Sequence, residues 1–195
     1  ITYQIIERLK TDLSNGIPRI SIIDGGAGTG KSILGIFLLK LLVDAQNETN
    51  WAIEENNLEE DLNLIANGLN YNLKMGYVVP MQNFRKTLKK VFKGIKGLSP
   101  NMVLSPADVA NSQDKYDILI IDEPTSQLDP EGTESVFAII KAMKDKQKTI
   151  ILVEHKIDLI AEYADDVLVL KDGELIAVGD KNEILTDITL MEKGV

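Results

Sequence analysis

The sequence predicts a three-layer α/β fold, in which helices cover both faces of a mostly parallel sheet. Three apolar runs, at 20–24, 117–122 and 149–153, have the length and β-branched content of strands buried on both faces. Each run precedes a segment whose apolar residues recur at helical spacing, and strands that alternate with helices are typical of parallel sheets. The 195 residues, 44% of them hydrophobic, suffice for one core, so we expect a single domain, 1–195.

Local signals predict the elements in order. The predicted strands are 20–24, 76–80, 102–104, 117–122, 149–153, 167–170 and 174–178. The predicted helices are 3–13, 32–42, 84–95, 130–145, 156–163 and 180–186, with one more amphipathic helix inside the polar segment 44–72. Pro130 suits a first helical turn, and Asp172-Gly173 between two alternating runs indicates a C-terminal β-hairpin. Residues 106–110 are expected to form a turn with Asp108 as a cap or a solvated carboxylate.

The composition excludes several kinds of site. The chain has no cysteine, so it can form neither a disulfide nor a thiolate metal site, and we expect a cytoplasmic protein. No apolar run approaches the roughly 18 residues that a membrane-spanning helix requires. The net charge of −9 argues against nucleic-acid binding by the whole surface, and all of the excess acid lies after residue 115.

Residues 25–32, GGAGTGKS, fit the pattern G-x-x-x-x-G-K-[ST] between a predicted strand and a predicted helix. Glycines allow successive N–H groups to surround phosphate oxygens at a helix N-terminus. In such a loop Lys31 would reach the β- and γ-phosphates, and the Ser32 hydroxyl would bind Mg²⁺. We therefore predict a P-loop NTPase fold that holds a nucleoside triphosphate; the alternative is a glycine-rich turn without a ligand. The expected nucleotide contacts are Gly25, Gly26, Ala27, Gly28, Thr29, Gly30, Lys31 and Ser32.

Polar residues that follow three other strands complete the predicted site. Asp122 ends the acidic strand and is predicted to hold Mg²⁺ with Ser32, and Glu123 is placed to orient or deprotonate an attacking water. His155, the only histidine, follows the strand expected beside the acidic one, where it would contact the γ-phosphate. Gln82, past the strand 76–80, is predicted to touch the metal or the water. The alternatives are a helix cap for the acid pair, a structural histidine and an ordinary polar loop residue.

The predicted helix 84–95 carries a basic flank beside its apolar face. The flank consists of Arg85, Lys86, Lys89, Lys90, Lys93 and Lys96. Such a flank could contact the phosphates of a nucleic acid, and it is also what the solvated side of an amphipathic helix looks like.

The second part of the chain resembles the C-terminal half of an ABC transporter ATP-binding subunit of the energy-coupling-factor type. The resemblance lies in EPTSQLDP at 123–130, ILVEH at 151–155 and EYADDVLVLKDGELIAVGDKNEIL at 162–185. In that family the metal aspartate and the catalytic glutamate match Asp122 and Glu123, the D-loop matches 126–129, and the switch histidine matches His155. The resemblance implies binding of ATP with Mg²⁺, a possible homodimer and a membrane partner.

Residues 1–121 instead resemble the N-terminal ATPase core of Schlafen-related superfamily 1 helicases. The likeness lies in GGAGTGKS, in GYVVPMQNFRKTLKKVFKGIKGLSPNMVLSPADV at 76–109 and in KYDILIID at 115–122. In that family the acidic strand continues toward DEAH, whereas here it continues as DEPT. The fold is accordingly expected to be RecA-like or ABC-like, and the resemblance implies a nucleic-acid-dependent ATPase.

Both resemblances are incomplete in ways that bear on activity. No LSGGQ-like signature lies between Gln82 and Asp122, and the second motor domain of a helicase, with its arginine finger, is not found. Loss of such a finger costs about 10³ to 10⁵ in rate where one operates, so we expect slow hydrolysis. Because the two resemblances meet at the acidic strand, we hypothesise a chimera, engineered or recombined, of two P-loop ATPases, with a helicase-like segment at 1–121 and an ABC-like segment at 122–195.

Overall fold

The structure of the chain is a computed structural model, and the residues it describes are 5, 18–26, 28–46, 73–112, 115–126, 130–154, 161–172 and 174–186. The described strands are β1 (Ile20–Gly25), β2 (Met75–Val78), β3 (Val103–Leu104), β4 (Ile118–Asp122), β5 (Thr149–Val153), β6 (Asp166–Lys171) and β7 (Glu174–Asp180). The described helices are α2 (Lys31–Gln46), α4 (Gln82–Gly94), α5 (Pro106–Ala110), α6 (Pro130–Asp145) and α7 (Lys181–Leu185).

These strands form one sheet in the order β3-β2-β4-β5-β1-β6-β7. Neighbouring strands from β3 to β6 run parallel, and only the last pair of this sheet, β6 with β7, is antiparallel. The phosphate loop (residues 25–32) follows β1, and the acid pair follows β4, with β5 between these two strands. The predicted fold class is confirmed, including the mostly parallel sheet and the C-terminal β-hairpin.

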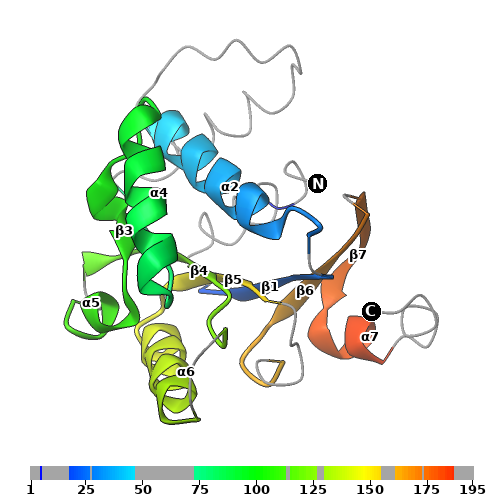
Figure 1. Cartoon of the computed structure of the whole chain (residues 1–195). Helices are drawn as coiled ribbons and strands as arrows, with labels where there is room; N and C mark the ends of the chain where they lie inside the picture. Colours follow the sequence, from blue (N-terminus) through cyan, green and yellow to red (C-terminus); the bar gives the residue numbers. More distant parts are fainter. Residues whose placement is uncertain are drawn as a thin grey trace.

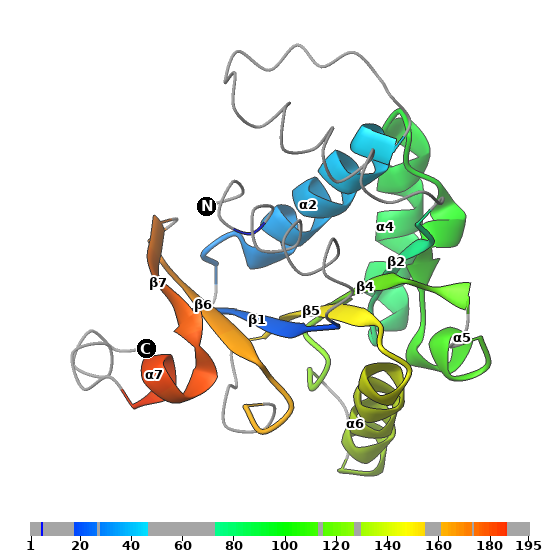
Figure 2. The same ribbon diagram turned by 180° about the vertical axis from the view of Figure 1, so that it is seen from behind.

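The sheet lies between two layers of helices, with α2 and α4 on one face and α6 on the other (Figures 1 and 2). Successive strand residues point to opposite faces, so each strand contributes to two hydrophobic cores. In β4, Ile118 and Ile120 pack in the core beneath α2 and α4, whereas Leu119 and Ile121 pack in the core beneath α6. The same alternation places the next residue, Asp122, on the face that α2 covers.

The predicted element bounds differ from the observed ones at a few ends. Helix α2 continues to Gln46, beyond the predicted end at residue 42, because Val43 and Ala45 are also buried in the core. Residues 106–110 form the short helix α5 rather than a turn, because Ser105 and Asp108 make a capping box. Asp108 is thus a cap, and its two hydrogen bonds with Ser105 are the main cause of its lowered pKa. The helix predicted at 3–13, apart from residue 5, lies outside the described residues, as do residues 47–72 of the segment 44–72 and residues 156–160 of the helix predicted at 156–163. Residues 161–163 form a turn and not the end of a helix.

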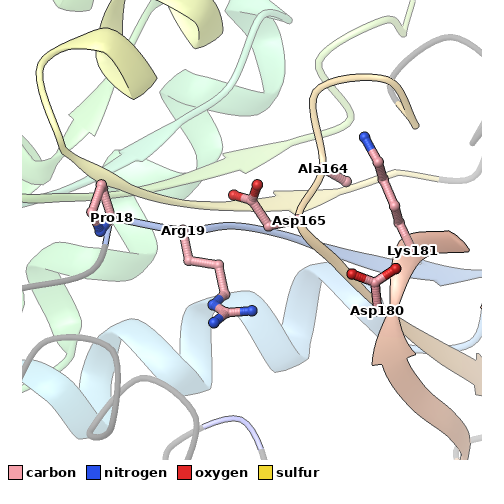
Figure 3. A pocket seen from close by; sticks show the side chains of 6 residues that line it. All are labelled: Pro18, Arg19, Ala164, Asp165, Asp180 and Lys181. Carbon is pink, nitrogen blue, oxygen red and sulfur yellow. The ribbon is translucent and has the colours of Figure 1, made fainter. Parts of the chain in front are cut away.

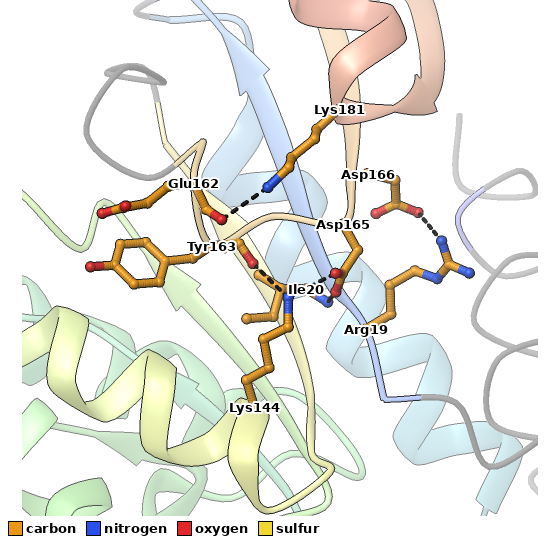
Figure 4. Close-up of polar contacts among 8 residues, drawn as sticks. All are labelled: Arg19, Ile20, Lys144, Glu162, Tyr163, Asp165, Asp166 and Lys181. Carbon is orange, nitrogen blue, oxygen red and sulfur yellow. Dashed lines mark hydrogen bonds and ion pairs between the residues drawn. The ribbon is translucent and has the colours of Figure 1, made fainter.

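The amino ends of β1 and β6 border a cavity of about 280 Å³, far from the carboxyl ends where the phosphate loop begins (Figure 3). It is lined by Pro18, Arg19, Ala164, Asp165, Asp180 and Lys181. The charged groups around it are engaged by neighbouring parts of the chain (Figure 4). Asp180, for example, caps α7 by accepting a hydrogen bond of 2.8 Å from the Asn182 N–H.

Asp165 is the centre of this network at the amino ends of the strands. Its carboxylate accepts hydrogen bonds from the Ile20 N–H and from Lys144 Nζ, each at 2.8 Å. Lys144 Nζ also lies 3.2 Å from the Tyr163 carbonyl oxygen, and Lys181 Nζ donates to the Glu162 carbonyl oxygen at 2.9 Å. These contacts join α6, β1 and the hairpin β6–β7, so we assign the network a structural role.

None of the described helices is both long enough and apolar enough to cross a lipid bilayer.

Candidate functional site

The phosphate loop leads from the carboxyl end of β1 into the first turn of α2. Gly28 and Gly30 have φ angles of 79° and 86°, a region that side chains disfavour and glycine enters freely. Between them, the Thr29 hydroxyl donates a hydrogen bond of 2.9 Å to the Gly26 carbonyl oxygen and tightens the turn. The first N–H groups of α2 have no partner within the helix, so the loop and the helix start offer several N–H donors to an anion.

Gly25 is required for a different reason. A Cβ atom at this position would lie 2.5 Å from the carbonyl oxygen of Leu170 in β6, too close for any real contact. Because a backbone atom and not a flexible side chain blocks the space, the first residue of the phosphate loop must be glycine for β1 and β6 to pair as they do.

Lys31 is held inside the loop. Its side chain is nearly buried, with 6% of the residue exposed, and its ammonium donates to the carbonyl oxygens of Gly25 and Gly26. The contact to Gly26 measures 2.8 Å. The loop therefore concentrates its positive charge where a phosphate chain would meet the N–H groups of the turn.

Ser32 and Asp122 are in direct contact across the site, 90 positions apart in the chain. The Ser32 hydroxyl donates a hydrogen bond of 3.0 Å to Oδ1 of Asp122. Oδ2 of the same carboxylate accepts a hydrogen bond of 2.9 Å from the hydroxyl of Tyr77, a fully buried residue of β2. The predicted pair of metal ligands is thus brought together, and its carboxylate is fixed at both oxygens.

Burial raises the pKa of Asp122 to about 6, from its ordinary value of 3.8. The hydrogen bonds from Tyr77 and Ser32 lower this pKa, the charge of Glu123 raises it, and the charge of Lys31 lowers it, but desolvation is the largest cause. A carboxylate that burial destabilises in this way gains more from a nearby cation than an exposed carboxylate would.

The Ser32 and Asp122 oxygens suit a Mg²⁺ ion. Mg²⁺ takes oxygen ligands in near-ideal octahedral geometry at 2.0–2.1 Å, so two adjacent ligands lie about 2.9 Å apart. The distance of 3.0 Å between Ser32 Oγ and Asp122 Oδ1 agrees with that spacing. Mg²⁺ ordinarily binds one or two such protein groups and completes its shell with water and phosphate oxygens.

The turn after β4, residues 123–126, holds Glu123 in an unusual backbone conformation. Its φ angle is 46°, in the left-handed region that non-glycine residues rarely adopt. The Glu123 N–H donates to the Val153 carbonyl oxygen at 2.7 Å, and its carbonyl oxygen accepts from the Ser126 N–H at 3.0 Å. Glu123 is half-buried, and its charge acts on the neighbouring Asp122 carboxylate.

A fully buried carboxylate, Glu154, supports this turn from the residue directly after β5. Its Oε2 atom accepts hydrogen bonds from the Thr125 hydroxyl at 2.7 Å and from the Thr125 N–H at 3.2 Å. The sequence motifs alone indicate no role for Glu154 or Tyr77 in the site. The available signal was a polar group inside, or directly after, an otherwise apolar strand.

Of the remaining predicted site residues, the structure describes Gln82 but not Ala27 or His155. Gln82 is the first residue of α4 and is exposed. β2 ends at the same sheet edge as β4, but Gln82 makes no hydrogen bond to Asp122 or to the described residues of the phosphate loop. Ala27 and His155 lie outside the described residues. As predicted, β5 lies directly beside β4. The roles of Gln82 and His155 stay predictions.

The basic flank predicted on 84–95 needs one correction. The Arg85 guanidinium is half-buried and donates to the carbonyl oxygens of Val79, at 2.6 Å, and Pro80, so Arg85 stabilises the end of β2. The exposed part, here called the basic face of α4, consists of Lys86, Lys89, Lys90 and Lys93; Lys96 follows the helix and is also exposed.

The site has three parts that together define a P-loop nucleotide-binding domain. They are the phosphate loop after β1, helix α2, which starts at Lys31 of that loop, and the acidic end of β4, which contacts the first turn of α2. The fold agrees with that of a solved ATP-binding cassette of an ABC transporter in its ADP conformation, with a TM-score of 0.51 over 89% of this chain and 86% of that chain. The two sequences are 14% identical, so this similarity concerns the fold alone.

The chain belongs to the Schlafen group 3 DNA/RNA helicase domain family, whose model matches residues 18–166. This confirms the resemblance to Schlafen-related helicases, and the match continues beyond residue 121 through the acid pair and β5. The helicase-type similarity therefore covers residues in which the sequence also resembles ABC subunits.

Curated relatives confirm the second resemblance. A putative ABC transporter ATP-binding protein of Methanosarcina acetivorans is 36% identical over 118 residues, covering 55% of this chain and 19% of the relative. Energy-coupling factor transporter ATP-binding proteins of Mycoplasma genitalium and Lactobacillus johnsonii are 42% and 44% identical over 77 residues. These matches cover 40% of this chain and 25% and 27% of the relatives, so the chain spans less than a third of the length of the curated relatives it matches.

The raised pKa of Asp122 predicts how stability varies with pH when no metal is bound. The folded protein favours the protonated carboxyl, so this contribution to stability is complete below pH 3.8 and is lost as the pH rises through about 6. Asp122→Asn removes the charge and should raise the free energy of unfolding at pH 7.5 by on the order of 1–3 kcal/mol, with little change at pH 4. Denaturant unfolding in EDTA at both pH values measures the effect.

The exposed Asp145, at the end of α6, supplies the matched control. Asp145→Asn should change the free energy of unfolding little at either pH. An equal effect of Asp122→Asn at the two pH values would contradict the assigned burial cost.

Proposed function

We propose that this domain binds ATP together with Mg²⁺ and hydrolyses the nucleotide slowly. The observation that carries the proposal is the contact of Ser32 with Asp122, 3.0 Å long, between a phosphate loop and an acid pair. The curated relatives are named as ATP-binding proteins, which favours ATP over other triphosphates.

The phosphate chain would be bound by N–H groups of the loop and of the first turn of α2. Lys31 would exchange its contacts with the Gly25 and Gly26 carbonyl oxygens for phosphate oxygens, which carry a larger negative charge. Mg²⁺, held by Ser32 and Asp122, would neutralise charge on the phosphate oxygens. The adenine base would lie beyond the residues that form the phosphate site.

Glu123 is the residue assigned to the attacking water. Its carboxylate would accept a proton as the water oxygen forms a bond to the γ-phosphorus, while the bond from that phosphorus to the ADP oxygen breaks. The hydrogen bonds of Glu123 and Thr125 to β5 and Glu154 hold the turn that carries this side chain. Slow turnover follows from the sequence, because no LSGGQ-like signature occurs between Gln82 and Asp122.

Lys31→Ala should abolish stabilisation of the protein by ATP, because the loop loses its only ammonium. For the wild-type chain, ATP at about 100 times its Kd adds about 2.7 kcal/mol, or several degrees in Tm. Thermal unfolding with and without Mg²⁺ and ATP measures the shift. Lys141→Ala, at an exposed position on α6, is the control and should keep the full shift. If ATP raised the Tm of Lys31→Ala and wild type equally, the site assignment would fail.

Glu123→Gln should retain ATP binding and lose phosphate release, because the amide has the same shape and accepts no proton. A positioned general base contributes about 10² to 10⁴ in rate, so single-turnover phosphate release should fall by at least about 10²-fold. Glu134→Gln, exposed on α6, should release phosphate as wild type does. Unchanged release in Glu123→Gln would remove this residue from its catalytic role.

A second candidate function, an interaction with nucleic acid, is favoured by the basic face of α4. Four lysines are exposed on one helix of a chain whose net charge is −9, and the matching family is a DNA/RNA helicase domain. Lysines placed along a helix can contact successive phosphates, which makes binding weaken steeply with salt.

The paired change Lys89→Glu and Lys93→Glu should therefore abolish binding of single-stranded DNA or RNA at low salt and leave ATP-induced stabilisation intact. Fluorescence anisotropy over a salt series measures binding, with Lys141→Glu on the opposite face of the sheet as the control. No binding by the wild-type chain at low salt would end this candidate function.

A further inference from the structure

Tyr77 is the one polar side chain of β2 that reaches the candidate metal site. β2 pairs with β4 so that Tyr77 lies opposite Ile120, two residues before Asp122. Two residues of strand span about 6.6 Å, a distance that a tyrosine side chain can cover along the strand direction. The ring packs edge-on against Phe92 of α4, with centroids 6.1 Å apart, and both residues are fully buried. This packing fixes the direction in which the hydroxyl points.

The hydroxyl of Tyr77 lies between two parts of the site. It is 2.9 Å from Asp122 Oδ2 and 3.2 Å from the carbonyl oxygen of Ser32. Its single proton makes the shorter contact, to the carboxylate. Because Oδ2 is engaged by Tyr77, Oδ1 is the atom left to accept the Ser32 proton, and the lone pairs of Ser32 Oγ are then directed away from Asp122.

Gly35 of α2 provides the room for this arrangement. A Cβ atom there would lie 3.1 Å from the Tyr77 hydroxyl oxygen, 3.3 Å from its ring atom Cε2 and 3.4 Å from Ile120 Cγ2. Glycine inside a helix costs roughly 0.5–1 kcal/mol relative to alanine, so its presence needs a reason. The close approach of Tyr77 to the helix supplies that reason.

We propose that Tyr77 is a positioning residue for Mg²⁺: its hydroxyl orients the Asp122 carboxylate toward Ser32, and Gly35 admits the tyrosine ring to the site. The inference rests on the proposed binding of ATP with Mg²⁺. Without the hydroxyl, Oδ2 of a carboxylate that is only 1% exposed loses its tyrosine donor, and the carboxylate can rotate away from Ser32. Partners that orient metal ligands in this way typically contribute about 10- to 100-fold to metal affinity.

The test compares the Kd for ATP in excess Mg²⁺ with the Kd in EDTA, by isothermal titration calorimetry on the full chain. The ratio of the two values isolates the contribution of the metal, and a variant that merely loosens the fold would weaken both. Tyr77→Phe should lower the Mg²⁺-dependent gain in affinity by about 10-fold and leave the Kd in EDTA near that of wild type.

Gly35→Ala tests the same contact without removing the tyrosine. It should reduce the Mg²⁺-dependent gain as Tyr77→Phe does, because the new methyl group displaces the hydroxyl. In the double variant Tyr77→Phe/Gly35→Ala, the alanine should cause no further loss, since no hydroxyl remains to be displaced. The matched controls are Tyr116→Phe, on the α6 side of the sheet, and Gly94→Ala, where an added Cβ meets nothing within 4 Å.

The outcomes separate this inference from the proposed function. A wild-type chain that binds no ATP, or binds it equally with and without Mg²⁺, overturns the proposed function and this inference with it. A wild-type chain that responds to Mg²⁺ while Tyr77→Phe responds equally overturns this inference alone. Additive losses from Tyr77→Phe and Gly35→Ala would also overturn it, because the two residues would then act through different contacts.

Discussion

The hydrogen bond from Ser32 to Asp122 holds the candidate site together, because it joins two segments that the sheet alone would keep apart. β5 lies between β1 and β4, so the phosphate loop and the acidic strand end are not neighbours in the sheet. Helix α2 lies on one face of the sheet (Figure 1), and the Ser32 hydroxyl in its first turn reaches Asp122 at the end of β4. The alternation of side chains in β4 then decides that Asp122 faces this helix and not α6.

Buried acids with hydroxyl partners recur around this contact. Asp122 accepts hydrogen bonds from Tyr77 and Ser32, and Glu154 accepts hydrogen bonds from Thr125. Neutral donors orient a carboxylate and satisfy its oxygens, but they cancel none of its charge. The buried Asp122 carboxylate, when ionised, is therefore a group with which a divalent cation would interact strongly.

The sequence was sufficient to predict the features that depend on short local patterns, namely the buried strands and the phosphate loop. The apolar runs predicted the buried strands to within about two residues at their ends, and the phosphate-loop pattern predicted the glycine-rich turn from strand to helix. In the structure, Gly28 and Gly30 of this turn have positive φ angles. The pairing of Ser32 with Asp122 was predictable because both residues belong to one recurrent arrangement of P-loop domains. The element order also sufficed to predict that β5 lies beside β4.

The supporting contacts were not predictable, because they depend on the tertiary structure. Nothing in the sequence near Tyr77 says that its hydroxyl meets an aspartate 45 positions later, and a tyrosine in an apolar strand is also an ordinary core residue. Helical spacing places Arg85 on a solvated flank, whereas carbonyl oxygens at the end of β2 accept its hydrogen bonds and hold it half-buried.

The close approach of Gly25 to Leu170 has consequences for how such domains recombine. The carbonyl oxygen of Leu170 leaves no room for a side chain on the first residue of the phosphate loop, so the β6–β7 hairpin and the loop restrict each other's sequence. Any exchange of C-terminal halves between P-loop proteins that preserves this pairing must bring a strand end to a loop that begins with glycine.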